Sequence, residues 1–574
     1  MCGIFTLVNQ DIELTKNKIY AHISKNKKRG PEVENFFIYD KNLVFCFHRL
    51  AINGLNSSGN QPLFYKKYII IGNGEIFNYK EIITKYNLTP KSNSDIEVLL
   101  YLYELYGTDL TKYINGEFSF ILYDGFKKEI MICRDPFGIR PLYYNYIKTK
   151  ITEQYKDYTV SREKDKFVFS STLSSLVDME GYDNNKIRQF NPGCFMILKL
   201  RENDNYYYFD RLEKYHILKP EIHHNFITNR SLDLYYRLKK AVEIRILTSE
   251  RPVGALLSGG LDSSLICSLA QQILKENNKP ALTTFSIGLH GSEDLKYSKL
   301  VADHIGSNHH QIILKNEDFL EAIPNVIYDI ESYDTTTVRA STGNWLIGKY
   351  IKENTDIKVV LNGDGADELM GGYLYFHKAP NDILFDGECR RLLSEIHYFD
   401  VLRSDRSIAS HGLETRTPML DKDFVNTYLS RDINERNHVN YNKYYIQKPN
   451  IEKYLIRNTI ELNNPKLLPK EILWRQKEAF SDGVSSMQKS WYEIIQEYLT
   501  NKIDNDETIK REMESLIYPS HLNCETLEQK YYFYIFNKHY KNCEHLIPHY
   551  WMPNFINAQD SSARTLKQVY KKKA

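Results

Sequence analysis

The chain has 574 residues, which is too long for one ordinary hydrophobic core and predicts two to four domains. Lys and Arg number 75 against 73 Asp and Glu, so the net charge of +2 gives no electrostatic footprint for nucleic acid or a membrane surface. No apolar run approaches the roughly 18 residues that span a bilayer, and the N-terminus lacks a signal-peptide pattern. We therefore expect a soluble, cytosolic protein.

The N-terminus carries the first chemical signal, because the chain opens Met1-Cys2-Gly3-Ile4. If Met1 is removed, Cys2 holds a thiol and a free α-amine, with reference pKa values of about 8.5 and about 7.7–8.0. Such a residue is a nucleophile with a base attached, and it can cleave amides by acyl transfer. A buried cysteine without a chemical role is the alternative. The eight cysteines form no Cys-x-x-Cys, so they indicate neither a zinc site nor a disulfide framework.

The first 200 residues or so have the pattern of β-structure, with short apolar runs separated by turn residues. The predicted strands are Gly3–Val8, Phe36–Tyr39, Leu43–Phe47, Tyr68–Ile71, Phe118–Tyr123, Glu129–Ile132, Phe167–Phe169 and Cys194–Leu200. One helix is expected after Asn78 and another over Ser94–Tyr106, where Ser94 and Glu97 have the spacing of a capping box. The polar stretch Lys148–Lys166 predicts an exposed loop.

Strands and helices alternate after about Tyr215, which favours a doubly wound parallel sheet. The linker is expected between Phe209 and His224. Beyond about Tyr441 the pattern is helical and polar, and the tail Ser561–Ala574 is expected to be mobile. The predicted strands are Val253–Leu257, Thr283–Gly288, Gln311–Leu314 and Ile357–Leu361, and the helices between them start at Asp262 and cover Ser298–His304 and Asp318–Ile330.

A loop of small residues follows the first of these strands: Ser258, Gly259, Gly260, Leu261, Asp262, Ser263 and Ser264. Glycines let backbone N–H groups approach an anion, serine hydroxyls add donors, and a helix N-terminus adds a positive dipole. A carboxylate such as Asp262 suits Mg²⁺ bound to the phosphates better than the phosphates themselves. The loop resembles the pyrophosphate loop of the ATP pyrophosphatases. The alternative is an ordinary Ser/Gly turn.

A second strand end carries Asn362-Gly363-Asp364-Gly365-Ala366-Asp367-Glu368. Ligands bind at the carboxyl ends of parallel strands. Three carboxylates beside a phosphate loop would repel one another unless a metal ion or cationic side chains intervene. A solvated acidic turn is the alternative.

Further motifs carry a resemblance to a known family. The N-terminal ones resemble a class II glutamine amidotransferase domain: Cys2-Gly3-Ile4, Arg29-Gly30-Pro31, Arg49-Leu50-Ala51-Ile52, Gln61-Pro62-Leu63, Asn73-Gly74-Glu75-Ile76-Phe77-Asn78 and Ser94-Asp95. Together with the two strand-end motifs, the chain resembles the glutamine-hydrolysing asparagine synthetases. The later motifs in the same order are 331–341, 372–380, 418–421 and 474–483.

The resemblance implies an N-terminal αββα sandwich of the Ntn type over residues 1–210 and an α/β domain of the ATP-pyrophosphatase type over residues 211–574. It implies that glutamine is hydrolysed in the first domain and that ammonia passes to the second. There aspartate and MgATP form β-aspartyl-AMP and pyrophosphate, and ammonia displaces AMP to give asparagine. ATP is a substrate, Mg²⁺ the metal, and a homodimer a possible assembly.

In the glutaminase domain the resemblance implies that Cys2 attacks the glutamine amide while its own α-amine moves the proton. The Asn73 side chain and the Gly74 N–H would form the oxyanion hole. Arg49, Asp95 and Glu75 would bind the α-carboxylate and α-ammonium of glutamine. A surface ion pair for Arg49 and a helix cap for Asp95 are the alternatives.

In the second domain the implied ATP-binding residues are Leu256, Ile287, Asn362, Gly363 and the loop Ser258–Ser264. Asp262 and Asp367 would hold Mg²⁺, and Lys477 would neutralise charge that develops on the phosphates. Thr336 and Arg339 are candidates for binding aspartate. Asp364 stands where the family has Glu, at a position associated with the attack of ammonia, while Asn362 and Ala366 replace serines.

Two rival functions remain open at this point. Another amidotransferase-synthetase, such as one that closes a β-lactam ring, would share the second domain, but those relatives lack the N-terminal Cys. Sugar-phosphate and phosphoribosyl amidotransferases lack the loop Ser258–Ser264. A non-catalytic sensor of glutamine or nucleotide is the rival from another class, and Asp364, Asn362 and Ala366 are its support.

Overall fold

The structure is a computed structural model that describes residues 1–10, 16–40, 42–155, 158–201, 203, 205–218, 229–439, 451–477, 491–558 and 560. The predicted mobile tail 561–574 and the motif residues 478–483 lie outside this range. The chain forms two compact units. Unit 1 comprises Met1–Ile217, Ala409–Leu413 and Asn537–Leu546, and unit 2 comprises Leu218–Ile408, Glu414–Phe536 and Ile547–Ala574.

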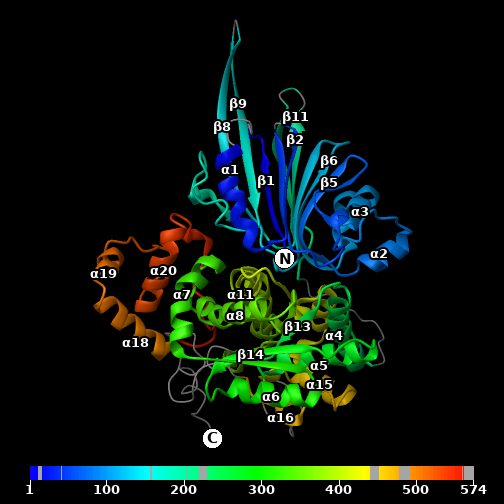
Figure 1. Cartoon of the computed structure of the whole chain (residues 1–574), viewed down its shortest axis with the longest axis vertical. Helices are drawn as coiled ribbons and strands as arrows, with labels where there is room; N and C mark the ends of the chain where they lie inside the picture. Colours follow the sequence, from blue (N-terminus) through cyan, green and yellow to red (C-terminus); the bar gives the residue numbers. More distant parts are fainter. Residues whose placement is uncertain are drawn as a thin grey trace. The chain divides into compact units, whose positions relative to one another are not determined.

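Unit 1 contains two antiparallel six-stranded sheets, in the orders β10-β8-β9-β1-β3-β2 and β12-β11-β7-β6-β5-β4 (Figure 1). Its elements are β1 (Gly3–Val8), α1 (Lys16–Ile23), η1 (Ser24–Lys28), β2 (Val33–Asp40), β3 (Leu43–Arg49), η2 (Ser57–Gly59), β4 (Leu63–Tyr65), β5 (Tyr68–Ile76), α2 (Tyr79–Tyr86), η3 (Asp95–Glu97), α3 (Val98–Tyr106), η4 (Gly107–Lys112), β6 (Gly116–Asp124), β7 (Glu129–Arg134), β8 (Tyr143–Tyr155), β9 (Tyr158–Ser170), η5 (Asn184–Lys186), β10 (Arg188–Gln189), β11 (Cys194–Arg201), β12 (Tyr206–Lys214) and η9 (Glu544–Leu546).

The two sheets of unit 1 pack face to face, because each strand alternates apolar residues toward the shared core. That core joins Ile4 and Phe45 of the first sheet to Ile71, Ile121 and Ile132 of the second. The outer face of the second sheet packs on α2 and α3, and α1 lies beside the first sheet (Figure 1). The predicted αββα sandwich is confirmed.

Two local predictions in unit 1 are wrong. The polar stretch 148–166 is mostly the paired arms of β8 and β9, since long strands that extend beyond a core need no apolar run. The capping box at Ser94 does not form either. Glu97 instead accepts hydrogen bonds from the backbone N–H groups of Lys91 and Ser92, at 2.8 and 2.7 Å.

A segment from the far end of the chain completes unit 1. The side-chain amide of Asn184 donates to the carbonyl of Lys541 at 3.0 Å, and the His545 ring lies 2.8 Å from the carbonyl of Ile187. These contacts lie next to β10, the edge strand of the first sheet. Residues that follow by more than 350 positions therefore contact the segment that leads into this edge strand.

Unit 2 is built on five parallel strands in the order β15-β14-β13-β16-β17. Its elements are α4 (Arg230–Leu247), β13 (Val253–Leu256), α5 (Leu261–Glu276), β14 (Thr283–Leu289), α6 (Glu293–Ile305), β15 (Asn308–Leu314), α7 (Asn316–Ile330), α8 (Thr335–Asn354), β16 (Val359–Leu361), α9 (Ala366–Met370), η6 (Leu374–Lys378), α10 (Asp382–Glu395), η7 (Ile396–Tyr398), α11 (Asp400–Ala409), β17 (Glu414–Arg416), η8 (Pro418–Leu420), α12 (Lys422–Leu429), α13 (Ile433–Arg436), α15 (Tyr454–Asn463), α16 (Lys470–Leu473), α18 (Trp491–Asp504), α19 (Glu507–Glu514) and α20 (Leu527–His539).

Helices cover both faces of this sheet, with α5 and α6 on one face and α8 on the other (Figure 1). The predicted doubly wound parallel sheet is confirmed. From β13 the chain adds β14 and β15 on one side and then returns to place β16 on the other side. The strand order therefore reverses between β13 and β16, and ligands bind outside the strand ends at such a point.

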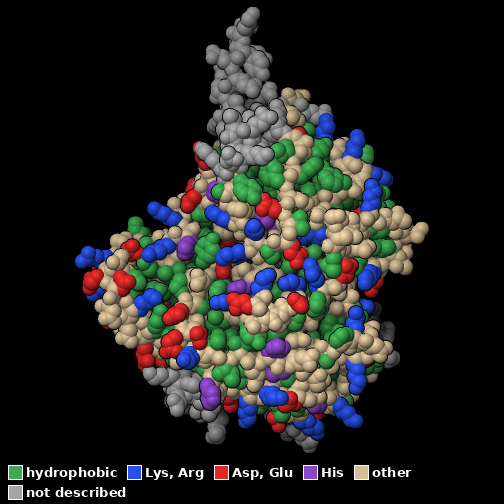
Figure 2. Space-filling view, in the orientation of Figure 1, with side chains coloured by type: hydrophobic (Ala, Val, Ile, Leu, Met, Phe, Trp, Pro, Cys, Tyr) green, Lys and Arg blue, Asp and Glu red, His purple; other side chains and the backbone are tan. Residues whose placement is uncertain are grey.

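The surface agrees with the balanced composition. Basic and acidic side chains are interspersed over the described residues on the face drawn in Figure 2. Among the helices that the structure describes, none is long and apolar enough to cross a membrane.

Candidate functional site

The predicted nucleophile of unit 1 lies against the predicted oxyanion-hole residue. The Cys2 backbone N donates to Oδ1 of Asn73 at 3.1 Å, and the Cys2 thiol lies 3.7 Å from the carbonyl oxygen of Leu50. Asn73 is fully buried on β5, and its Nδ2 has no hydrogen-bond partner within the described part of the chain. A side-chain N–H group without a hydrogen-bond partner, next to a thiol, is suited to stabilise the oxygen of an amide that the thiol attacks, because that oxygen gains negative charge.

Gly74 follows Asn73 on β5 and has a φ of 132°. A Cβ at this position would lie 2.0 Å from the carbonyl oxygen of Glu117 on β6, so only glycine fits. A glycine next to Asn73 thus allows β5 and β6 to approach closely at the predicted oxyanion hole.

The three residues predicted to bind glutamine have partners of their own. Arg49 is 4% exposed and donates to the carbonyl of Asn56 at 2.8 Å and to Oδ1 of Asn60 at 2.6 Å, so it is not the surface ion pair considered as an alternative. Glu75 accepts from the side chain of Asn53 at 2.5 Å. Asp95 does not cap α3. Its Oδ2 accepts from the backbone N–H of Ile76 at 2.6 Å.

Met1 is buried in this structure. Its sulfur lies 3.4 Å from Arg29 and 2.8 Å from Arg140, and Arg29 also donates to the Cys2 carbonyl at 3.1 Å. Arg140 forms a fully buried ion pair with Glu117 at 3.0 Å. Arg29 therefore contacts both residues that flank the peptide bond that removal of Met1 would cleave.

In unit 2 the loop Ser258–Ser264 connects β13 to α5. The Ser258 and Ser263 hydroxyls lie 3.0 Å apart, and Ser263 also accepts from the Ser258 N–H at 3.2 Å. Gly259 has a φ of 78°, and a Cβ there would lie 2.5 Å from the backbone N of Ser298. The tight turn keeps the hydroxyls and the helix N-terminus together, which is the arrangement that binds phosphate groups.

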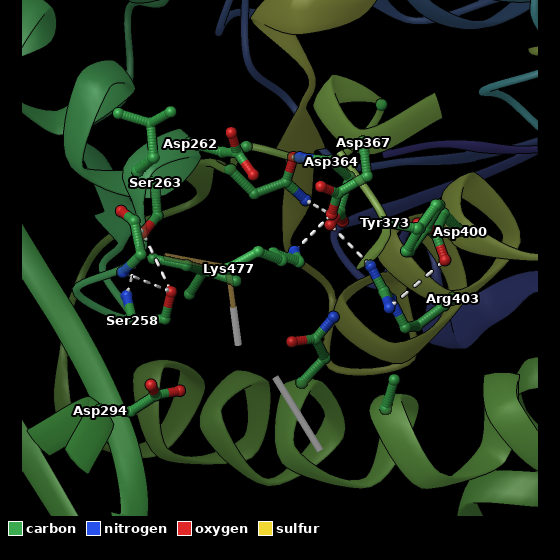
Figure 3. Close-up of a pocket in the computed structure, with 18 of the residues that line it drawn as sticks. Ser258, Asp262, Ser263, Asp294, Asp364, Asp367, Tyr373, Asp400, Arg403 and Lys477 are labelled. Atoms are coloured by element: carbon green, nitrogen blue, oxygen red, sulfur yellow. Dashed lines mark hydrogen bonds and ion pairs between the residues drawn. The ribbon is translucent and has the colours of Figure 1, made fainter. Parts of the chain in front are cut away.

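A cavity of about 240 Å³ opens at the carboxyl ends of β13, β14 and β16 (Figure 3). All the predicted site residues of unit 2 line it except Gly259 and Ser264: Leu256, Ser258, Gly260, Leu261, Asp262, Ser263, Ile287, Thr336, Arg339, Asn362, Gly363, Asp364, Asp367 and Lys477. The fold therefore brings together residues from 256 to 477 at one place.

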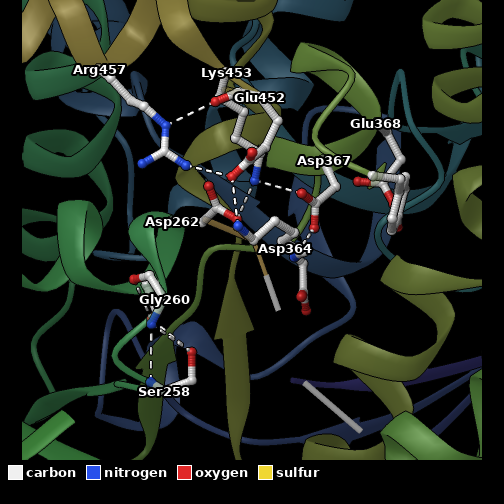
Figure 4. Close-up of polar contacts among 12 residues, drawn as sticks. Ser258, Gly260, Asp262, Asp364, Asp367, Glu368, Glu452, Lys453 and Arg457 are labelled. Carbon is white, nitrogen blue, oxygen red and sulfur yellow. Dashed lines mark hydrogen bonds and ion pairs between the residues drawn. The ribbon is translucent and has the colours of Figure 1, made fainter. Parts of the chain in front are cut away.

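Carboxylates and ammonium groups alternate at the centre of this cavity. The Lys453 Nζ lies 2.6 Å from Oδ2 of Asp262 and 2.5 Å from Oδ1 of Asp367 (Figure 4). Lys477 reaches Oδ2 of the same Asp367 at 2.5 Å. Although burial works in the opposite direction, the two lysines hold the pKa of Asp367 well below its usual value. Both lysines thus form ion pairs with Asp367, the carboxylate that follows β16.

A second buried pair supports the lysines. Glu452 accepts from the backbone N–H of Lys477 at 2.7 Å and from the guanidinium of Arg457 at 2.6 Å (Figure 4). Arg457 also donates to the carbonyl of Leu473 at 2.6 Å. This network ties the segment that carries Lys477 to the start of α15, next to Lys453.

Asp364 has a specific cationic partner. Its Oδ1 lies 2.6 Å from Arg403 on α11, and its Oδ2 accepts from the side chain of Asn362 at 2.9 Å (Figure 3). Burial raises the pKa of Asp364, and the charge of Arg403 opposes this only in part. A carboxylate whose pKa is raised is a stronger base than an ordinary aspartate, which suits a group that accepts a proton.

The two candidates for binding aspartate lie on α8. The Thr336 hydroxyl donates to the carbonyl of Trp551 at 3.3 Å. The Arg339 guanidinium pairs with Glu528 at 2.5 Å and with Asp560 at 2.8 Å. An arginine that lines a cavity while it holds two carboxylates is a built binding point for carboxylate groups.

Sequence reasoning missed three site residues: Lys453, Glu452 and Arg403. Lys453 precedes an amphipathic helix, where lysines are normally solvated, and its side chain is 1% exposed. A signal existed, because three carboxylates beside a phosphate loop require cations. Charge repulsion calls for a metal ion or cationic side chains, but it does not indicate where in the chain those side chains lie.

Two family models match the chain. The glutamine amidotransferase domain matches residues 1–214, and asparagine synthase matches residues 233–385 and 381–536. An asparagine synthetase (glutamine-hydrolysing) of Gallus gallus is 39% identical over 586 residues, which cover 99% of each chain. Its counterpart in Homo sapiens is 38% identical over 585 residues, covering 99% of this chain and 98% of that one.

Solved structures give weaker likenesses. A glutamine phosphoribosylpyrophosphate amidotransferase from B. subtilis, complexed with ADP and GMP, has a TM-score of 0.29 at 15% identity and covers 54% of this chain and 81% of that one. An NMN synthetase from Francisella tularensis has a TM-score of 0.24 at 12% identity and covers 56% and 98%. Both TM-scores are below 0.5.

Proposed function

Because the chain belongs to the glutamine-hydrolysing asparagine synthetases, we propose how its residues divide the work of glutamine-dependent asparagine synthesis. Residues 1–210 would hydrolyse glutamine, and residues 211–574 would activate aspartate with ATP and combine it with the ammonia released. The observation that carries the proposal is that β13 and β16 bring a phosphate loop and a lysine-clamped carboxylate to one cavity.

At the glutaminase site, removal of Met1 would leave Cys2 with its thiol and α-amine. The thiolate would attack the side-chain amide of glutamine, and the α-amine would carry the proton to the departing ammonia. The unused Nδ2 of Asn73 and the Gly74 N–H would hold the oxyanion. Water would then cleave the thioester and release glutamate. Arg49, Glu75 and Asp95 would bind the α-carboxylate and α-ammonium of the substrate.

At the synthetase site, the loop Ser258–Ser264 would bind the pyrophosphate part of ATP. Leu256 and Ile287, which line the cavity, would contact the adenine, with Asn362 and Gly363 close to the nucleotide. Lys477 would neutralise negative charge on the leaving pyrophosphate, since an ammonium group stabilises phosphate oxygens that gain charge.

The residues at this site fit the Mg²⁺ that accompanies ATP. Oδ1 of Asp262 is buried with no hydrogen-bond partner among the described residues, and Asp367 is its neighbour through Lys453. Mg²⁺ commonly uses one or two carboxylates and completes its shell with phosphate oxygens and water. When bound, Mg²⁺ would offset phosphate charge.

Thr336 and Arg339 would position aspartate so that its β-carboxylate attacks the α-phosphorus of ATP, which releases pyrophosphate. Ammonia would then attack the acyl carbon and AMP would leave. Asp364, with its raised pKa, would take the proton from the attacking ammonia. A homodimer in the cytosol is the assembly and location that we propose on the resemblance alone.

Release of pyrophosphate in the presence of aspartate, ATP and glutamine tests the function. Cys2→Ala should abolish synthesis from glutamine and leave synthesis from added ammonium intact. Equal loss of both would overturn the division between the two sites. Folded protein that binds nucleotide without turnover would support the non-catalytic sensor instead. The mass of the N-terminal peptide shows whether Met1 is removed.

A further inference from the structure

The segment that follows unit 1's last residues runs along the cavity of unit 2. Trp551 and Pro553 line the cavity, and the Trp551 N–H donates to the buried Asp334 at 2.8 Å. Further along, the Phe555 ring lies 6.1 Å from Tyr375. Asp560, five residues after Phe555, contacts Arg339 on α8.

The guanidinium of Arg339 has two edges, and each holds a different carboxylate. Glu528 on α20 accepts from Nε at 2.8 Å and from Nη2 at 2.5 Å, and its side chain is fully buried. Asp560 accepts from Nη1 at 3.1 Å and from Nη2 at 2.8 Å. The side chain of Asp560 is 14% exposed. One carboxylate is thus part of the core, whereas the other is in reach of solvent.

We infer that Asp560 occupies the place of a substrate carboxylate on Arg339 and competes with aspartate for it, while Glu528 is a positioning residue. This inference rests on the proposed function, which assigns Arg339 to aspartate binding. Glu528 fixes the guanidinium so that its Nη1/Nη2 edge faces a second carboxylate. In the chain without substrate, that second carboxylate is Asp560.

The exchange is favourable on three grounds. A carboxylate group replaces a carboxylate group, so the charge around Arg339 stays the same. The Arg339 guanidinium can bind either carboxylate, that of Asp560 or that of the substrate, through the same pair of hydrogen bonds. The partner that leaves is the one with access to water, so its charge is solvated again when it departs, whereas release of Glu528 would leave a charge in the core.

The competition has a kinetic signature. A group tethered to the chain acts as an inhibitor at a fixed effective concentration, commonly in the millimolar range for a short tether. It raises the KM for aspartate and leaves kcat unchanged, because saturating aspartate displaces it. It does not affect the KM for ATP or for glutamine.

The test is synthesis driven by ammonium, measured as pyrophosphate release against aspartate concentration. Asp560→Asn removes the charge and should lower the KM for aspartate about three- to tenfold, with kcat within twofold. Asp560→Glu should keep the wild-type KM within twofold. Asp504→Asn is the matched control, since Asp504 is an exposed aspartate at the end of α18 and should change neither constant. Titration calorimetry with L-aspartate, in the absence of turnover, should likewise show a lower Kd for aspartate in Asp560→Asn than in wild type.

An unchanged or higher KM for Asp560→Asn, in protein whose melting temperature equals that of wild type, would overturn the inference. A separate variant tests the assignment on which it depends. Arg339→Lys keeps the charge and loses the fork, so it should raise the KM for aspartate at least tenfold. If it does not, the proposed aspartate site is wrong. If it does and Asp560→Asn has no effect, only the competition is wrong.

Discussion

Substitution of Lys453 by methionine tests the central charge network of unit 2. The ammonium lies within 2.6 Å of Asp262 and 2.5 Å of Asp367, and its side chain is 1% exposed. Methionine has a similar length and no charge, so Lys453→Met leaves two close carboxylates with Lys477 as their remaining cation at the centre of the cavity. Removal of one partner from a buried ion pair costs about 3–5 kcal/mol.

We expect a loss of about 3 kcal/mol in the free energy of unfolding of unit 2, at the low end of that range, because both carboxylates are partly exposed. In a unit of this size the loss lowers the melting temperature by about 4 °C. Scanning calorimetry measures this shift. Pyrophosphate release should fall together with stability, since the phosphate site loses a cation.

Added Mg²⁺ sharpens this experiment. The substitution frees the oxygens that Lys453 holds, so 10 mM Mg²⁺, about the concentration used in such assays, should raise the melting temperature of Lys453→Met more than that of wild type. Lys299→Met is the matched control, because Lys299 pairs with Asp303 where the two side chains are 57% and 62% exposed. That exposed ion pair should contribute less than ~0.5 kcal/mol to the free energy of unfolding. If both variants melt alike, the reasoning about the buried network is refuted.

Two further predictions concern other parts of the molecule. Asn73→Ala should lower the rate of glutamate release from glutamine about 10²–10³-fold, since it removes a hydrogen-bond donor of the oxyanion hole. Synthesis from added ammonium should be unchanged. A loss confined to the ammonium reaction would contradict this prediction. Burial lowers the pKa of His309 from 6.5 to about 4, so the folded chain binds fewer protons than the unfolded chain between these values. The contribution of His309 to the stability of unit 2 should therefore be fully present above pH 6.5 and be lost as the pH falls toward 4. His309→Asn should reduce the loss of unfolding free energy between pH 7 and pH 5 by on the order of 2 kcal/mol, as measured by urea denaturation at both pH values.

The sequence predicts well what depends on local pattern. Apolar runs such as Gly3–Val8 and Val253–Leu257 become β1 and β13, nearly to the residue. The loop Ser258–Ser264 and the turn after β16 come together because parallel strands end at one edge of a sheet. Resemblance supplied the rest of the predicted site, including Lys477.

What the sequence does not reveal depends on contacts between distant residues. Arg339 pairs with residues 189 and 221 positions away, and no local pattern marks such partners. Lys453 looks like a solvated lysine until α15 brings it beside Asp262. The arms of β8 and β9 look like a loop, because their pairing with each other does not require an apolar face.

The late segment that completes unit 1 has a consequence for the order of events during synthesis. Roughly 320 residues separate Ile217 from Asn537, so at about 5–20 residues per second the ribosome needs roughly 15 to 65 seconds to add the segment. During that interval the edge at β10 lacks its contacts from Lys541 and His545. The nascent first unit therefore lacks these contacts at its sheet edge until residues 541–545 have been added, and chaperones that shield strand edges would act there.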